Sequence, residues 1–265
     1  MIAAVLLTLA QGTSAVPPFP APRALADDQL ELCMDKARTD PTSAISEASE
    51  WLSGVSTEDG SYPQQCLGMA YTALLRWEAA ERAFLAAREA APQAAHFRRA
   101  QLAAMAGNAA LAEGRGKAAL VALNLAASDA EASGDKALQA ITQVDRARAL
   151  VLQGDTMQAG AALTSARSLD PQSPYAWLLS ATLSRRLGNL DEAQAHIETA
   201  AALAPEYPEI GLEAGVIAML RGKEAAAVES WRSVIRLEPN GDAAAAARGY
   251  LKQIGETAGE AAASR

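Results

Sequence analysis

Few side chains in this sequence have the types and spacing that catalysis requires. The two histidines, His96 and His196, lie 100 residues apart, and no serine and aspartate stand at a spacing that would complete a nucleophilic triad with either one. The glycines are spread along the chain and form no phosphate-binding loop. Acidic pairs such as Asp191 and Glu192 are better explained as first-turn charges, which the helix dipole favours. The residues therefore predict a protein that is not an enzyme and uses no cofactor or metal.

The spacing of three prolines indicates how the chain is organised instead. Pro171, Pro205 and Pro239 stand 34 residues apart, and each closes a segment with the same arrangement of small residues. A 34-residue period predicts helix–turn–helix units stacked side by side, because one such unit cannot bury its own apolar face without a neighbour. The chain is therefore expected to present a binding surface, not a pocket.

Two kinds of position recur in every unit. Small residues allow the two helices of a unit to approach closely, and larger residues are expected to fill the gap between units. Proline cannot continue the second helix and ends it. The small residues are Gly68, Gly107, Ala147, Ala181 and Gly215 on the first helices and Ala80, Ala119, Ala159, Ala193 and Ala227 on the second, and the larger ones are Phe84, Leu123, Leu163, Ile197 and Trp231.

These residues resemble the tetratricopeptide repeat, whose pattern is an early Trp, Leu-Gly, a Tyr three residues later, then Ala, an aromatic residue, Ala and Pro. The cleanest unit runs from Tyr175 to Pro205, with Trp177 early in its first helix and Gly188 at its turn. The resemblance covers about 180 of the 265 residues. It implies an all-α, right-handed superhelical solenoid of antiparallel helix pairs, with five to six repeats and a C-terminal capping helix.

The expected organisation follows from these units. We expect a signal-peptide-like segment at 1–15, a proline-rich linker at 16–26 and a degenerate first helix pair at 27–60. Five repeats are expected at 61–94, 100–133, 140–173, 174–207 and 208–241, then a capping helix at 242–254 and a disordered tail at 255–265. We expect two irregularities between units, where a solenoid tolerates them. One is an insertion at 95–99, with His96 in a surface loop, and the other is a loosened joint at 134–135.

The N-terminus resembles a secretory signal. Residues 1–15, MIAAVLLTLAQGTSA, hold no charged side chain, and an apolar run is followed by small residues, with cleavage expected after Ala15 or Ala10. The usual basic start is missing, and the run is too short to span a bilayer. We expect export to the periplasm. The alternative is a cytoplasmic protein with a buried or frayed apolar N-terminus.

The acidic net charge of the chain argues against some classes of partner. The chain carries 23 Lys and Arg residues against 31 Asp and Glu residues, a net charge of -8, and it has no basic run. Phosphate binding needs clustered basic side chains, so nucleic acid is not an expected partner. No segment after the N-terminus has the length of a membrane helix, so no membrane span is expected in the mature chain.

Cys33 and Cys66 are the only cysteines. An even number of cysteines in an exported protein favours a disulfide, and these two are expected on adjacent helices. Their separation of 33 residues is close to one period, however, and equivalent places in neighbouring units lie roughly 9 to 10 Å apart, beyond the ~7 Å that a disulfide allows. Two buried reduced thiols are therefore the alternative. Metal binding is not expected, because no histidine or third cysteine is near.

The resemblance also implies a binding groove. In the family, the second, fifth, ninth, twelfth and thirteenth places of each unit line a concave surface. Some members use Lys and Asn at the fifth and ninth places to clamp a C-terminal carboxylate, but here those places hold other residues, such as Val144 and Arg148. The implied partner-binding residues are Tyr62, Met69, Asn108, Arg148, Val151, Tyr175, Leu178, Arg185, Arg186, Leu212 and Met219, and the same places include Leu111, Leu152 and Thr182.

An extended or helical peptide, with apolar anchors and an acidic group near Arg148 or Arg185, suits this groove. Two alternatives remain open. The inner apolar residues could simply pack between neighbouring helices, or the groove could be filled by the protein's own tail or a second copy. The leading hypothesis is a non-enzymatic scaffold that binds a protein or peptide in the cell envelope. The other hypotheses are a structural or self-associating module and an accessory subunit of an envelope or secretion complex.

Overall fold

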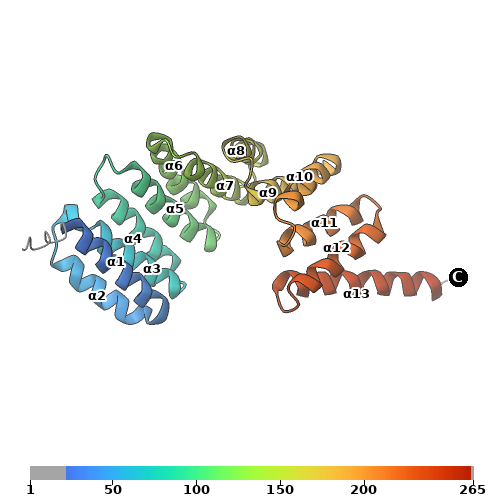
Figure 1. Ribbon diagram of the computed structural model, residues 1–265, viewed down its shortest axis with the longest axis horizontal. Coiled ribbons are helices and arrows are strands. Elements are labelled where there is room, and N and C mark those ends of the chain that lie inside the picture. The colour runs from blue at the N-terminus through green and yellow to red at the C-terminus, as the bar shows by residue number, and fades with distance from the viewer. Residues whose placement is uncertain (1–21, 264–265) are drawn as a thin grey trace, which may run out of the picture.

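A computed structural model describes residues 22–263 of the chain (Figure 1). Thirteen α-helices follow one another in this part, so the predicted all-α architecture is confirmed. The helices are α1 (Pro22–Thr39), α2 (Pro41–Ser53), α3 (Ser61–Ala73), α4 (Trp77–Ala90), α5 (His96–Ala112), α6 (Gly116–Ser133), α7 (Lys136–Leu152), α8 (Thr156–Leu169), α9 (Pro174–Arg186), α10 (Leu190–Leu203), α11 (Pro208–Leu220), α12 (Glu224–Leu237) and α13 (Asp242–Ala263), with a 3₁₀ turn at Thr57–Asp59.

The helices form one curved array of sequential pairs. Each helix packs against the next one along the chain, and contacts between odd-numbered helices join α1 to α3, α5 to α7, α9 to α11 and α11 to α13. Figure 1 shows an arch in which α5, α7 and α9 lie beneath α6, α8 and α10, so the odd-numbered helices form the inner layer. The core is accordingly a series of small clusters, as in a repeat protein.

Small residues set the spacing inside the pairs, as predicted. A Cβ atom added at Gly68, Gly107 or Gly215 would collide with Phe84, Leu123 or Trp231 respectively. These three larger side chains are almost completely buried. Close helix contact at these points therefore requires glycine.

Each turn within a repeat ends its first helix with a left-handed residue. Four of these residues are glycines, with φ between 73° and 81° at Gly114, Gly154, Gly188 and Gly222. The first repeat has Leu75 at this place, with φ 56°. Left-handed backbone costs a residue with a side chain about 1–2 kcal/mol, so Leu75 keeps an unfavourable conformation that glycine avoids.

The middle of the array differs from the prediction. The predicted insertion at 95–99 is not a loop, because residues 96–99 belong to α5, whereas Gly134 and Asp135 do form the turn between α6 and α7. The helices around these places are longer than their counterparts: α5 and α7 have 17 residues where α3 and α9 have 13, and α6 has 18 where α4 has 14. The inserted residues lengthen these helices by about one turn each. His96 thus begins α5.

Buried charges connect the helices at this lengthened end. The Arg88 guanidinium contacts the Asp129 carboxylate at 2.8 Å, and Arg99 donates to the carbonyl oxygens of Arg88 and Ala91 at 2.7 and 3.2 Å. Arg88, Arg99 and Asp129 are all buried. The ion pair therefore ties α4 to α6, with Arg99 of α5 between them.

Two boundaries near the ends also need correction. Residues 22–26 were predicted to be linker but form the first turns of α1, since Pro22 suits a first helical position and alanine, leucine and arginine propagate a helix. Residues 255–263 were predicted to be disordered but continue α13, where alanine and glutamate favour helix. The signal-like segment and the remainder of the predicted linker lie outside the described residues.

Candidate functional site

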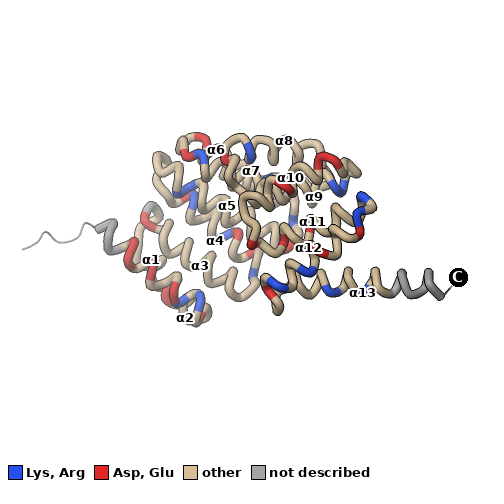
Figure 2. The backbone as a smooth tube through the Cα atoms, turned by 45° about the vertical axis from the view of Figure 1, so that its right-hand side comes forward, with Lys and Arg blue, Asp and Glu red and all other residues tan. Residues whose placement is uncertain are grey.

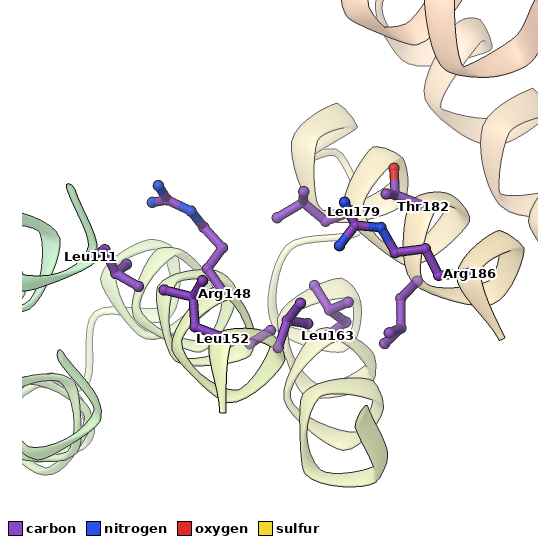
Figure 3. A pocket seen from close by; sticks show the side chains of 10 residues that line it. Leu111, Arg148, Leu152, Leu163, Leu179, Thr182 and Arg186 are labelled. Atoms are coloured by element: carbon purple, nitrogen blue, oxygen red, sulfur yellow. The ribbon is translucent and has the colours of Figure 1, made fainter. Parts of the chain in front are cut away.

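An apolar pocket of about 280 Å³ lies between inner helices α7 and α9 (Figure 3). These two helices contact each other little, whereas α5 contacts α7 and α9 contacts α11. The space opens where two successive units diverge. Its lining consists of Leu111 from α5, Ala147, Arg148, Val151 and Leu152 from α7, Leu163 from α8, and Leu179, Thr182, Leu183 and Arg186 from α9.

The pocket has a buried floor and a partly exposed rim. Leu163 and Leu183 are buried, and they belong to the cluster that packs α7 against α8 and α9. Leu152 at the rim is 53% exposed. An aliphatic floor beneath an exposed leucine is suited to an apolar side chain from outside, because burial of such a group releases water from both surfaces.

Arg148 borders the pocket but is already engaged. Its Nη1 donates to the Asp145 carboxylate at 2.9 Å and to Asn108 Oδ1 at 3.0 Å, and Asn108 Nδ2 donates to the same carboxylate at 2.7 Å. This network joins α5 to α7. The charge of Arg148 is therefore largely balanced within the protein.

Arg185 and Arg186 are neighbours in sequence with different surroundings. Arg185 donates two hydrogen bonds, of 2.6 and 3.2 Å, to the Glu213 carboxylate on α11. Arg186 is exposed and makes no hydrogen bond or ion pair with any other described residue. Figure 3 shows its guanidinium reaching over the pocket beside Leu179, on the side opposite Arg148. Arg186 is thus the available cation at the rim.

Only part of the predicted groove comes together in this pocket. Arg148, Val151 and Arg186 line it, whereas Asn108 does not line it and bonds to Arg148 and Asp145. Leu178 is 6% exposed and packs against α10 and α11, which corrects its assignment as a binding residue. The other predicted residues lie apart: Tyr62 lies against the Arg98 guanidinium, Met69 packs in the N-terminal core, Leu212 and Met219 pack in the C-terminal core, and Tyr175 is exposed at the start of α9.

Four lining residues were not predicted for the groove, namely Ala147, Leu163, Leu179 and Leu183. Ala147 and Leu163 were predicted only as spacing and filling residues. Leu179 and Leu183 lie four residues apart on α9, a spacing that places both on one helix face. That spacing is a signal for an apolar face, but it does not say whether a neighbouring helix covers the face.

Cys33 and Cys66 form a disulfide between α1 and α3, with their Cα atoms 6.0 Å apart. The two residues are not at equivalent places of regular units, because the first helix pair departs from the repeat pattern. The longer separation of equivalent places therefore does not apply.

Searches for other kinds of site find little in the part of the chain that the structure describes. Among the described residues, no cluster of three or more histidine, cysteine, aspartate or glutamate residues has a geometry that could hold a metal. None of the helices in residues 22–263 combines the length and apolar character that crossing a bilayer requires.

The sequence of the central units matches a known family model. Residues 150–214, from the end of α7 into α11, match the model of the tetratricopeptide repeat. This segment of the chain consists of tetratricopeptide repeats. A search of curated protein sequences finds no match.

Solved structures of tetratricopeptide repeat proteins share the fold. PilW, a widely conserved type IV pilus biogenesis factor, aligns with a TM-score of 0.67 at 16% identity, over 84% of this chain and 97% of its own. PilF of Pseudomonas aeruginosa aligns with a TM-score of 0.64 at 14% identity, over 86% and 98%. YrrB, which has an unusual peptide-binding site, aligns with a TM-score of 0.51 at 19% identity, over 76% and 97%. At these identities the likeness concerns the fold alone.

Proposed function

We propose that this protein is an exported scaffold of the cell envelope that binds an apolar segment of a partner protein in the pocket between α7 and α9. Tetratricopeptide repeat proteins are typically non-enzymatic scaffolds for protein interaction. The observation that carries the proposal is an apolar cavity on the inner layer with an unpaired arginine at its rim. Such pockets anchor the few side chains that supply most of the binding energy in an interface.

Two observations support the envelope as the location. A disulfide joins Cys33 to Cys66, and disulfides persist in oxidising compartments such as the periplasm. One of the similar solved structures, PilW, is a type IV pilus biogenesis factor. An envelope assembly is therefore a reasonable place to look for the partner.

A pair of matched variants tests the pocket. Leu152→Asp places a charge at the rim of the pocket, and Val121→Asp places the same charge on α6 in the outer layer. The side chains of Leu152 and Val121 are 53% and 65% exposed, so neither substitution should unfold the protein. In pull-downs from envelope extract, Leu152→Asp should lose the partner that the parent and Val121→Asp recover. Equal recovery by both variants would remove the pocket from the proposal.

The location has its own test. Protein isolated from its native cells without reductant should fractionate with the periplasm and show no free thiol after unfolding. Two titratable thiols in a cytoplasmic fraction would contradict export.

Self-association remains the other candidate, but one feature weighs against end-to-end stacking. Helix α13 covers the last repeat, and Tyr250 stacks on the Trp231 ring with centroids 4.9 Å apart. An apolar end that is already covered offers less surface to a second copy.

A further inference from the structure

We propose that the pocket recognises a bulky apolar side chain together with a neighbouring carboxylate on the partner, and that Arg186 is the residue that selects the carboxylate. This inference rests on the proposed function, since it assumes that a protein segment enters the pocket. It assigns the charge recognition to one arginine of the three near this surface.

The size of the pocket favours a single side chain. A cavity of about 150 Å³ holds a benzene ring, and drug-sized ligands occupy roughly 300 to 1,000 Å³. At about 280 Å³, the space between α7 and α9 suits one aromatic or branched aliphatic group. Leu163, Leu179 and Leu183 would surround this group with apolar contacts.

The local charge favours an acidic partner. Residues 136–186, which span α7 to α9, carry six basic and three acidic residues, a net charge of +3 in a chain of net charge -8. Helix α8 contributes one charged residue, Arg167, and the tube of this helix is almost entirely tan, the colour of uncharged residues, in Figure 2. The segment from α7 to α9 therefore carries an excess of basic residues in a chain that is acidic as a whole, which favours an acidic partner segment at this place.

The three arginines differ in their hydrogen bonds and ion pairs within the protein. Arg148 is held by Asp145 and Asn108, and Arg185 is held by Glu213. Recruiting either one would require breaking an internal ion pair. Arg186 has no such partner among the described residues, and its planar guanidinium can take a carboxylate with two parallel hydrogen bonds. The apolar surface beside it reduces competition from water.

Methyl-detected NMR titration with short peptides tests the inference. The probes are decanoate and three capped hexapeptides. The peptides are acetyl-Gly-Ser-Phe-Glu-Ser-Gly-amide and the same peptide with Phe-Gln or Ala-Glu at its centre. Binding is scored from the methyl shifts of Val151, Leu163 and Leu179. The proteins are the parent, Arg186→Gln and Arg232→Gln. Arg232 of α12 is exposed, has no partner among the described residues and provides the same charge change away from the pocket.

The parent should bind the Phe-Glu peptide about three- to tenfold more tightly than the Phe-Gln peptide, the range expected for a partly exposed charge-assisted pair. The Ala-Glu peptide should barely shift the pocket methyls. Arg186→Gln should remove the preference for glutamate while retaining binding of the phenylalanine, and Arg232→Gln should behave as the parent does.

Three results would overturn the inference. Equal affinity for Phe-Glu and Phe-Gln, or an unchanged preference in Arg186→Gln, would exclude carboxylate recognition by Arg186 but leave apolar binding in the pocket intact. Pocket shifts with decanoate and with none of the peptides would indicate a fatty-acid site and would also overturn the proposed function.

Discussion

At the scale of single residues, the turn of the first repeat is the clearest departure from the rest of the array. Leu75 takes the left-handed place that glycine takes in the other four turns, and it is 67% exposed, so its side chain gains little from packing. Leu75→Gly should relieve the strain at the cost of some chain entropy, for a net stabilisation of up to about 1 kcal/mol. Urea unfolding checks this.

The reverse substitution provides the control. Gly188→Leu should destabilise the protein by about 1–2 kcal/mol, because the same backbone then carries a side chain. A stabilising Gly188→Leu, or a strongly destabilising Leu75→Gly, would show that the turn does not impose this conformation.

Glycine at a helix crossing allows close contact between two helices. Replacing glycine by alanine should therefore destabilise the protein at a crossing and stabilise it at an open helix position. A Cβ at Gly215 would collide with the buried Trp231 ring, whose Nε1 donates to Leu212 O at 3.2 Å and limits its movement. Gly215→Ala should therefore destabilise by about 1–3 kcal/mol. Gly249→Ala in α13 meets no atom within 4 Å and should stabilise by about 0.5–1 kcal/mol. Thermal unfolding of both variants provides the comparison, and the same sign for both would refute close packing at Gly215.

His196 predicts a pH dependence. Burial lowers its pKa from the ordinary 6.5, the nearby Arg167 lowers it further, and Glu192 and a backbone hydrogen bond at Ser180 oppose these effects. The unfolded state therefore binds the proton more readily, so stability is retained above about pH 6.5 and falls as the pH drops below it. Between pH 7.5 and 5.5, His196→Gln should lose less stability than the parent in urea unfolding. An equal loss in both would exclude the histidine as the cause.

The candidate site shows what sequence could and could not predict at this scale. The family pattern placed Arg148, Val151 and Arg186 on one surface, since repeat position fixes the direction of a side chain. It did not predict that Leu178 is buried or that Glu213 engages Arg185, because both depend on residues in the following unit. Ion pairs between units have no fixed spacing in sequence, so the free arginine could only be recognised in the structure.

At the scale of helices, the disulfide ties α1 to α3 and should stabilise one end of the array. Closing a loop of 33 residues contributes about 3 to 4 kcal/mol in the chain-entropy model. In the Cys33→Ala, Cys66→Ala double variant, hydrogen exchange should accelerate in α1 to α3 and stay unchanged in α9 to α12. Reductant should have the same local effect on the parent and none on the variant.

Uniform acceleration along the chain would contradict this prediction. Repeat arrays lose structure locally because each unit contacts only its neighbours, and the packing of these helices follows that rule. A global response would instead indicate one cooperative core.

Helix existence and order were predictable from the 34-residue period, whereas helix length was not. The extra residues before α5 and between α6 and α7 interrupt the period in sequence, and an interruption alone does not distinguish a loop from an added turn. The alanine-rich composition of α5 and α6 favours helix in these extra residues, and the buried ion pair between Arg88 and Asp129 joins the lengthened helices. The latter is a contact across 41 residues, which no local pattern contains.

At the scale of the whole molecule, curvature gives the central units their role. The helices form an arch (Figure 1), and the pocket lies on its inner layer between α7 and α9, which contact each other little. The larger apolar groups of the end units are directed into covering helices, as Trp231 is beneath α13. The account therefore locates partner binding at the middle of the array.

Site-specific photo-crosslinking in cells tests that location most directly. A benzophenone side chain is introduced at Leu152, on the rim of the pocket, and separately at Val121, on the outer helix α6, since both positions are exposed. The account predicts a crosslinked partner from position 152 and none from position 121. The same partner crosslinked from position 121 alone, or equally from both positions, would contradict binding in the inner pocket.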